Sequence, residues 1–357
     1  MNADAVATVN PSLPPDPVAP PPAVVIDGSY RFGTYGAAIP VVNLLDAAGS
    51  SPVRRALRGL RTKEWQAFQA GDDDTFILGA VYTAKVSGLL QVLVVNKAAA
   101  TIQRWQKLVP GWVPAVAHGL SGTRSHGHAG GFSVTITNEF DDGVVRIDAT
   151  HPGRGDLAPL ELHGVGRCGA DDAGHLVIVH PFADGRALYS HKTMMPFDAS
   201  VRVGSDEIGL AEDRGFLIID DHHGEYPRPQ RYDWLTAVRR SRTGLIEGFN
   251  LTANQVRDPE VFNENALWIA NAVHRLPAIT VERPNGPWGK WHARDRSGAV
   301  DVTFTPTVRN SLHLGPRRCL AEYYAPYGWF EGAIDTGSAR LELDGFFGMG
   351  EQKLIRL

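Results

Sequence analysis

The sequence predicts an all-β fold, mainly antiparallel, with a few short helices. Its 38 glycines and 24 prolines divide the chain into short apolar runs, which is typical of strands joined by turns. Several runs alternate in polarity: Val145, Ile147 and Ala149 fall on one face of an extended segment, and Arg146 and Asp148 on the other. A period of two marks a strand with one solvated face. Many short strands predict barrels or a sandwich, and 357 residues suit two consecutive barrels.

The strand candidates follow one another along most of the chain. Turn signals at 141–143, 183–185 and 336–338 are suited to hairpins. The predicted strands are 76–85, 89–96, 131–138, 144–150, 176–180, 200–203, 215–220, 244–250, 278–282, 300–304, 328–334 and 339–343.

Two segments have helical character. In the better one, residues 53–69, Leu57, Leu60 and Phe68 fall near one face and the arginines on others. Ser51 is a suitable N-cap because a proline follows it. We interpret the arginines as the solvated face of this helix rather than a binding patch. Residues 259–268 predict a second, weaker helix or a turn.

The chain divides into a tail and two units. Residues 1–23 are rich in proline, which fixes φ and removes a backbone donor, so we interpret them as a disordered or loosely polyproline-like tail. The sequence LELHG at 160–164 is echoed by LELDG at 341–345, which fits two similar β units. The predicted division is a tail at 1–23, a first barrel at 24–180 and a second barrel at 181–357.

Composition narrows the class of protein. The formal charge is −4, which gives no electrostatic reason to expect nucleic acid or an anionic membrane as partner. Two cysteines, Cys168 and Cys319, do not suggest a disulfide scaffold, and a reduced compartment fits better. The N-terminus lacks the pattern of a secretory signal, and no run approaches the roughly 20 apolar residues of a transmembrane helix. We expect a cytoplasmic protein with no transmembrane segment.

Common catalytic and cofactor motifs are absent from the sequence. It contains no GxSxG elbow, phosphate-binding loop, HExxH or CxxC pattern. His126 and His128 have the spacing of metal ligands, but no third ligand can be assigned and a surface loop is the better interpretation. We therefore expect neither a metal nor a cofactor.

The strongest chemical signal lies between Phe216 and Trp268. An apolar run leads directly into Asp220 and Asp221, so these carboxylates stand at the end of a strand that leaves a core. Partial desolvation favours the acidic form of a carboxylate, which general-acid catalysis requires. His222 and the residue after it alternate in an extended chain, so at most one of them shares a face with Asp220. A polar hairpin is the plain alternative.

Two further groups of residues could face a ligand. Tyr189 and His191 lie two apart on one strand face and could share a substrate, or they could satisfy each other inside a core. Glu264 and Asn265 are polar among apolar neighbours, and their flanking Asn263 could cap the following segment. The tryptophans, among them Trp65, Trp234, Trp268, Trp288 and Trp291, could line a pocket for an apolar ligand or fill a core without one.

The order of several short motifs resembles a known family. The series comprises Gly33, Gly36, Pro40 and Asn43; Lys63-Glu64-Trp65; Tyr189-Ser190-His191-Lys192; Asp220 and Gly224; Trp234; Gly248 and Asn250; Asn263-Glu264-Asn265-Ala266; Phe304-Thr305-Pro306; and Gly328, Phe330-Glu331-Gly332, Gly345, Gly348 and Glu351. It resembles domain of unknown function 2804 over nearly all of the chain after the tail. That family is distantly similar to the carotenoid 1,2-hydratase group, which includes hydratases and cyclases of terpenoid or polyketide-type substrates. The resemblance implies two lipocalin-like β-barrels in tandem with an apolar cavity, and it carries no catalytic residue across.

The leading hypothesis is a cofactor-independent enzyme that hydrates, dehydrates or isomerises an isoprenoid or lipid-like substrate in an apolar barrel cavity. Protonating an alkene needs a positioned acid, and the catalytic candidates are Asp220 or Asp221 with His191 or His222 as partner. The substrate-binding candidates are Tyr189, Tyr226, Trp234, Asn250, Glu264, Asn265 and Trp268.

Two other classes of function fit the same sequence. A non-catalytic carrier of apolar small molecules would have a largely apolar cavity, with the acids and His191 facing solvent. A structural or interaction module would have both barrels filled by side chains. The expected partner is a hydrophobic small molecule in the first two cases, and the sequence leaves the oligomeric state open.

Overall fold

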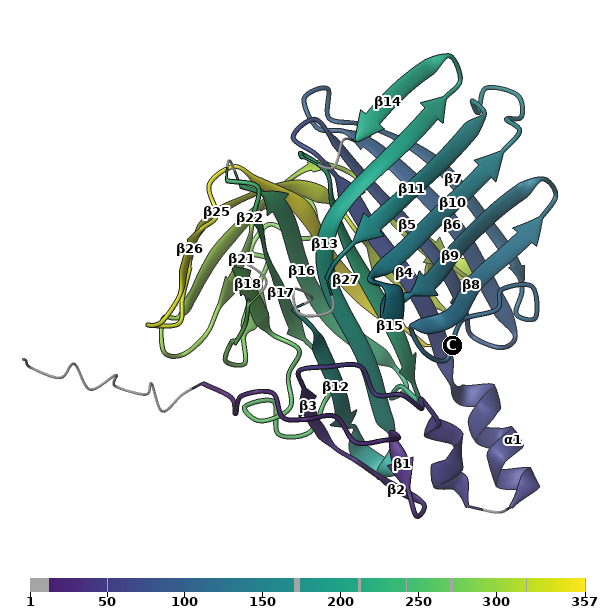
Figure 1. Ribbon diagram of the computed structural model, residues 1–357, viewed down its shortest axis with the longest axis vertical. Coiled ribbons are helices and arrows are strands. Elements are labelled where there is room, and N and C mark those ends of the chain that lie inside the picture. The colour runs from purple at the N-terminus through teal and green to yellow at the C-terminus, as the bar shows by residue number, and fades with distance from the viewer. Residues whose placement is uncertain are drawn as a thin grey trace, which may run out of the picture.

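The protein folds into two strongly curled, nearly closed antiparallel sheets that lie beside one another (Figure 1). This computed structural model describes residues 13–49, 51–169, 174–210, 213–241, 243–269, 272–318 and 320–356. The predicted all-β class with two barrel-like units is confirmed. Cys319 lies outside the described residues.

The first sheet has 13 strands. They are β3 (Gly33–Tyr35), β4 (Lys63–Gly71), β5 (Thr75–Thr83), β6 (Ser87–Asn96), β7 (Thr101–Pro110), β8 (Ser121–Ala129), β9 (Phe132–Glu139), β10 (Val144–His151), β11 (Leu160–Arg167), β12 (Leu176–Pro181), β13 (Ala187–Val203), β14 (Asp206–Leu210) and β15 (Phe216–Gly224). The main path runs β7–β6–β5–β4–β15–β13–β11–β10–β9–β8. Strands β12 and β14 pair with β13, and β3 pairs with β12.

The second sheet has 12 strands. They are β16 (Gln230–Arg240), β17 (Ile246–Ala253), β18 (Ala266–Ile269), β19 (Ala272–Arg275), β20 (Thr280–Glu282), β21 (Trp291–Arg294), β22 (Val300–Val308), β23 (Ser311–Leu314), β24 (Ala321–Tyr324), β25 (Tyr327–Asp335), β26 (Arg340–Glu342) and β27 (Phe346–Ile355). Its main path is β19–β18–β17–β16–β27–β25–β22–β21–β20, with β24 on β27, β23 on β24 and β26 on β25.

The remaining elements are short. A two-stranded hairpin is formed by β1 (Val25–Ile26) and β2 (Ser29–Tyr30). The helices are η1 (Leu44–Ala48), α1 (Pro52–Arg61), η2 (Phe140–Asp142), η3 (Ala183–Gly185) and η4 (Pro316–Arg318).

Three sequence-based boundaries are corrected by the structure. The predicted helix 53–69 ends at Arg61, and the rest of it is β4, which alternates toward two buried surfaces. The predicted barrel boundary at residue 180 falls inside the first sheet, because β12 pairs along its length with β13; the change of sheet comes between Gly224 and Gln230. Residues 259–268 were predicted as a helix or a turn; the turn is observed, and its end is corrected, because β18 begins at Ala266.

The described part of the predicted tail is ordered by backbone hydrogen bonds. Val18 donates to the carbonyl of Thr34 and accepts from Gly36. Ala23 bridges to Val41 in a parallel arrangement. Proline removes donors but leaves carbonyls, so a proline-rich segment can still lie along a sheet edge. Residues 1–12 lie outside the described part.

Helix α1 begins as predicted but presents its apolar residues to solvent. Ser51 caps it by accepting from the amide of Arg54 at 3.4 Å. Leu57 and Leu60, which were expected to face a core, are 53% and 59% exposed. Three of its arginines are paired with acids, and Arg58 binds Glu225 at 2.9 Å.

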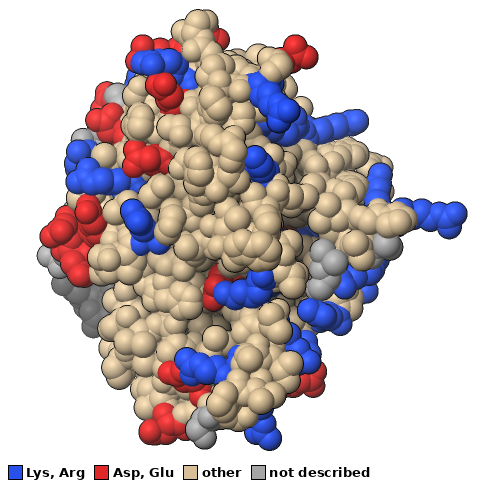
Figure 2. All heavy atoms as spheres, turned by 90° about the vertical axis from the view of Figure 1, so that its right-hand side faces the viewer, with Lys and Arg blue, Asp and Glu red and all other residues tan. Residues whose placement is uncertain are grey.

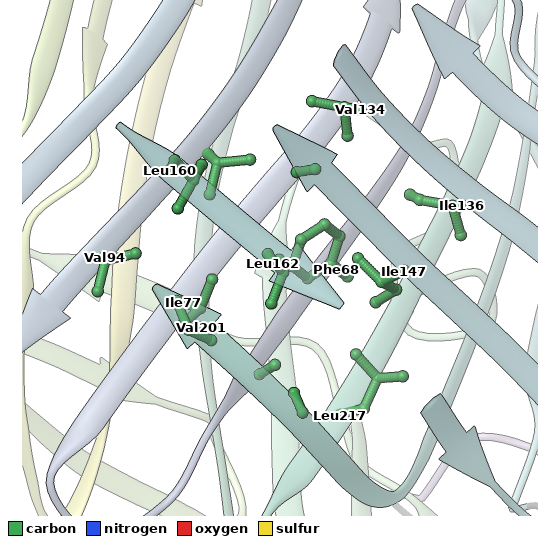
Figure 3. Packing of buried hydrophobic residues seen from close by; sticks show 14 of the residues in the cluster. Phe68, Ile77, Val94, Val134, Ile136, Ile147, Leu160, Leu162, Val201 and Leu217 are labelled. Atoms are coloured by element: carbon green, nitrogen blue, oxygen red, sulfur yellow. The ribbon is translucent and has the colours of Figure 1, made fainter. Parts of the chain in front are cut away.

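Each curled sheet is filled by its own apolar core, and a third core joins the two. Inside the first sheet, Phe68, Val134, Ile147 and Leu217 pack against one another (Figure 3). Phe249, Trp291, Phe304 and Phe330 are part of the core of the second sheet. The third core brings side chains of both sheets together, such as Phe76, Ile218, Tyr327 and Phe347. A strand shared between two cores must be apolar on both faces, which explains the continuous apolar run that opens β15.

The surface shows no concentrated charge on the face seen in Figure 2, where both signs are scattered among wide uncharged areas. Among the described residues, no helix has the length and apolar character needed to cross a membrane.

Candidate functional site

The two central strands of the first sheet direct a group of polar side chains toward the second sheet. Strands β13 and β15 pair Ser190 with His222 and Lys192 with Asp220. The next pair places His222 opposite Trp65 of β4. Because side chains alternate along a strand, these residues share one face, while Asp221 and its odd-numbered neighbours share the other. The predicted separation of adjacent acids and histidines is therefore observed.

Lys192 is the centre of this cluster. Its Nζ lies 2.8 Å from Asp220 Oδ1 and 2.7 Å from Glu264 Oε2. It also lies 2.8 Å from Nε2 of His222 and from the hydroxyl of Ser190. Glu264 comes from the segment before β18, so the lysine joins the two sheets by ionic contacts. The lysine and both carboxylates are less than 5% exposed.

His222 lies between the acids and an aromatic wall. Its Nε2 is 3.0 Å from Asp220 Oδ1 and 2.9 Å from the Ser190 hydroxyl, and its Nδ1 is 3.2 Å from the hydroxyl of Tyr226. Its ring stacks on Trp65 with centroids 4.4 Å apart. The Trp65 indole also donates to Asp220 Oδ2 at 3.2 Å. Both ring nitrogens of His222 thus have polar neighbours, and one face of the ring is stacked on Trp65.

The electrostatic interactions of the cluster keep Asp220 ionised and Lys192 protonated. Burial alone would raise the pKa of Asp220, but the charges of His222 and Lys192 and their hydrogen bonds outweigh it and hold that pKa far below its usual range. Burial opposes the charge of Lys192, yet Asp220 and Glu264 raise its pKa above the ordinary value. Burial, then Glu264 and Asp220, raise the pKa of Tyr226, so this phenol stays protonated.

The cluster lines a cavity of about 660 Å³ between the two sheets. This volume is within the range of small-molecule sites. The sequence predicted a cavity within a barrel, but this cavity lies between the two sheets, and the described residues inside each sheet form its apolar core. The wall is mostly apolar and aromatic, and it includes Ala67, Leu78, Ala80, Tyr82, Leu89, Leu108, Phe182, Leu188, Trp234, Leu320 and Met349.

Two asparagine side chains donate hydrogen bonds to Glu264. Asn254 donates to Glu264 Oε1 at 3.2 Å, and Asn250 donates to the Glu264 carbonyl at 2.6 Å. The indole of Trp234 donates to Asn250 Oδ1 at 2.6 Å. The Trp234 ring lines the cavity, whereas Asn250 lies behind it. Asn250 is thus placed to orient Glu264 and Trp234 rather than to touch a ligand.

Several predicted site residues lie away from the cavity. Asp221, Tyr189 and His191 point to the interior side of the first sheet, where His191 Nε2 lies 2.9 Å from Nδ1 of His175. Asn265 bonds the Thr252 amide and the Pro277 carbonyl. The Trp268 indole donates to the Gly174 carbonyl and packs in the shared core. All five residues are fully buried in structural roles.

A second polar cluster lies on the opposite face of β15. One ligand atom each from Glu64, His118 and His223 lie within 4.8 Å of one another, so these residues could hold a metal ion. The same groups form an ion network by themselves: Lys85 binds Glu64, and His223 lies 3.2 Å from Asp221. Burial lowers the pKa of His223, but Asp221 and Glu64 raise it to about 9. An imidazolium between two carboxylates accounts for this cluster.

The sequence reasoning missed Lys192, Asn254, Lys63, Gln230, Glu351 and Lys353, all of which line the cavity, whereas Trp65 was among the tryptophans expected at a pocket or in a core. Lys192 belongs to the same short motif as Tyr189 and His191. The face that carries Tyr189 and His191 was preferred because the sequence does not give the pairing register of this strand. Once Lys192 is known to pair with Asp220, alternation alone selects Ser190 and Lys192.

A family model described as "Domain of unknown function (DUF2804)" matches residues 43–357. The chain belongs to the DUF2804 family. The site residues of this DUF2804 protein, from Lys63 to Lys353, all lie within the matched region. No curated protein matches the chain.

The fold of this DUF2804 protein is similar to a solved structure, that of kievitone hydratase from Nectria haematococca. The two chains are 13% identical, with a TM-score of 0.52, over 91% of this chain and 96% of the other. At this identity the similarity concerns the fold.

Proposed function

We propose that the protein is a cofactor-independent hydro-lyase that adds water to, or removes it from, a hydrophobic molecule held between the two sheets. The observation that carries this proposal is the Lys192, Asp220, His222 and Glu264 cluster in the wall of a mainly apolar cavity. Buried, hydrogen-bonded ionisable groups in a cleft are typical of acid–base sites. The fold similarity to a protein named as a hydratase supports the same reaction class.

In this proposal His222 transfers the proton and Asp220 does not. The pKa of Asp220 is held far below its usual range by His222 and Lys192, so in this proposal Asp220 stays ionised and orients the imidazole of His222. Histidine is the side chain suited to exchange protons near neutral pH. Lys192 lies between Asp220 and Glu264, and its charge offsets part of the repulsion between the two carboxylates.

In the proposed hydration, the proton that leaves His222 is replaced by one from the attacking water. His222 gives its proton to one carbon of a C=C bond, and the neighbouring carbon becomes cationic. The oxygen of a water molecule bonds to that carbon and releases a proton, which returns to the imidazole. Dehydration is the reverse, in which the leaving hydroxyl takes a proton from the imidazolium. Tyr226 and Trp234 line the cavity, where their aromatic rings would stabilise the cation.

The test is isotopic and starts from the protein's own ligand. Small molecules that co-purify with the protein are identified by mass spectrometry and incubated with it in water enriched in oxygen-18. Incorporation of one heavy oxygen, or formation of a product lighter by one water, supports the proposal.

A parallel incubation in deuterium oxide separates the alternatives. Deuterium on carbon without heavy oxygen would mean an isomerase that uses the same proton donor. A tightly bound ligand that keeps its mass in both solvents would mean a carrier. Either of these results would overturn the hydro-lyase assignment.

A further inference from the structure

We infer that the cavity holds the carboxylate end of an amphipathic substrate, bound by Lys63, Gln230 and Lys353. That the carboxylate belongs to a substrate rests on the proposed function, whereas its binding can be measured without turnover. These three residues lie apart from the acid–base cluster and have no role in the proton transfer described above.

Lys63 is a buried cation that lacks an acidic partner. It is 7% exposed and donates to the neutral Oε1 of Gln230 at 3.1 Å. Within the described chain, no carboxylate oxygen lies within 4.0 Å of its Nζ. Burial, then the like charges of Lys353 and Arg228, lower its pKa to about 8. A buried charge is normally paired, so an unpaired one at a cavity wall indicates a missing anion.

Gln230 supplies an independent indication of an acceptor. Its side chain is 1% exposed, and its Nε2 has no hydrogen-bond partner among the described residues. Buried amide donors are nearly always satisfied. Since the other end of this amide binds Lys63, the free donor lies next to the unpaired lysine. The free Gln230 Nε2 and the remaining hydrogens of the Lys63 ammonium match the two oxygens of a carboxylate.

Lys353 brings the second positive charge. Its Nζ donates to the Tyr232 hydroxyl at 2.7 Å and lies over the rings of Trp65, Tyr232 and Tyr323. Burial lowers its pKa, and only the charges of Glu351 and Asp220 oppose that effect. No carboxylate of the described residues lies within 4.0 Å of it. Lys63, Lys353 and Arg228 outnumber Glu351 at this end of the cavity, so it keeps a net positive charge that fits an anion.

Trp65 links the two ends of the site. One indole stacks on His222 at 4.4 Å and lies under Lys353 Nζ at 5.2 Å. A substrate anchored at Lys353 would therefore extend past Trp65 toward His222. Most of the remaining cavity wall is apolar, so the substrate class is an unsaturated or hydroxylated carboxylic acid with a hydrophobic body.

The test compares three ligands with the same apolar chain, after removal of co-purified molecules. Laurate, dodecanol and dodecyl phosphate are titrated at pH 7 and followed by calorimetry and by quenching of tryptophan fluorescence. We expect laurate to bind at least tenfold more tightly than dodecanol. Equal affinity for laurate and dodecanol would overturn the inference, and tighter binding of dodecyl phosphate would overturn the choice of a carboxylate.

Substitutions of the two cavity lysines test where the carboxylate binds. Lys63→Met and Lys353→Met should each reduce the preference for laurate by about tenfold while leaving dodecanol affinity within twofold. Lys290→Met removes an exposed lysine from the same protein and should keep the preference. If laurate stays preferred in both cavity variants, the proposed anion site is wrong. Laurate selectivity without isotope incorporation into the native ligand would instead reject the hydro-lyase and leave the anion site standing.

Discussion

Lys192 Nζ lies 2.7 Å from Glu264 Oε2, and this contact joins the central strand of one sheet to the other sheet. Both side chains are buried, and the lysine also binds Asp220. A single ammonium therefore binds one carboxylate from each sheet at the cavity wall. The assembly of the site and the association of the sheets depend on the same residue.

Replacing Lys192 with methionine should destabilise the protein strongly. Removing the cation leaves Asp220 and Glu264 buried close together, and breaking a buried ion pair costs about 3–5 kcal/mol. Urea unfolding would measure the loss. The exposed Lys290→Met is the matched control and should change stability by less than about 0.5 kcal/mol. A loss below about 1 kcal/mol for Lys192→Met would contradict a structural role for this contact.

Replacing His222 with glutamine should abolish most turnover and spare ligand binding. Glutamine can keep hydrogen bonds to Tyr226 and Asp220 but cannot transfer a proton, and a positioned acid or base contributes about 10²–10⁴-fold to the rate. Isotope incorporation into the native ligand gives the rate, and calorimetry gives the affinity. His163→Gln alters an exposed histidine of β11 and should leave both unchanged. Full turnover in His222→Gln would remove this residue from the mechanism.

Filling the cavity should block binding without unfolding the protein. Ala67 and Ala80 pair across β4 and β5, and both face the cavity. Ala80→Phe places a ring in that space, so we expect ligand affinity to fall more than tenfold with a stability change within about 1 kcal/mol. Ala98→Phe, in an exposed turn, is the control. Unchanged affinity in Ala80→Phe would show that the ligand binds elsewhere.

Replacing Lys63 with methionine should stabilise the protein at neutral pH. The pKa of this lysine is about 8 in the folded state and 10.5 in the unfolded state, so its buried charge costs about 3 kcal/mol below pH 8. The cost shrinks as pH rises from 8 to 10.5, because the folded protein releases its proton first. The gain in Lys63→Met should therefore be full at pH 6 and small at pH 10. Urea unfolding at several pH values would show this, and a gain that grows with pH would contradict it.

Sequence patterns located most of the strands. They did not show which strands pair or which sheet each strand joins. Alternation identified β10, β22 and β25, because each has one face in a core and one in solvent. It failed for β4, whose two faces are both partly buried; the helical period seen at Leu60 and Phe68 came from two consecutive elements. The barrel boundary was misplaced because β12 pairs with β13, a relation that no local signal records.

The candidate site was predicted only in part, because the sequence does not show which face of a strand meets the cavity. Asp220, His222, Tyr226, Trp234 and Glu264 all lie at the cavity, and their chemistry was visible as polar residues among apolar ones. Asp221, Tyr189 and His191 carry the same chemistry, but their side chains lie on the opposite face of the same sheet. Polarity along a chain reports which residues are unusual, and it does not report which side of a sheet they occupy.

The sequence by itself determined the all-β class, the family, and the separation of neighbouring residues onto opposite faces, because these follow from a strand period of two and from motifs in order. Only the tertiary structure decided which face meets the cavity, that Lys192 stands opposite Asp220, and that the cavity lies between the barrels. Those features depend on strand register and on the packing of one sheet against another, which are set by contacts between residues far apart in the chain. The pairing of Lys63 with Gln230, 167 residues away, is of the same kind.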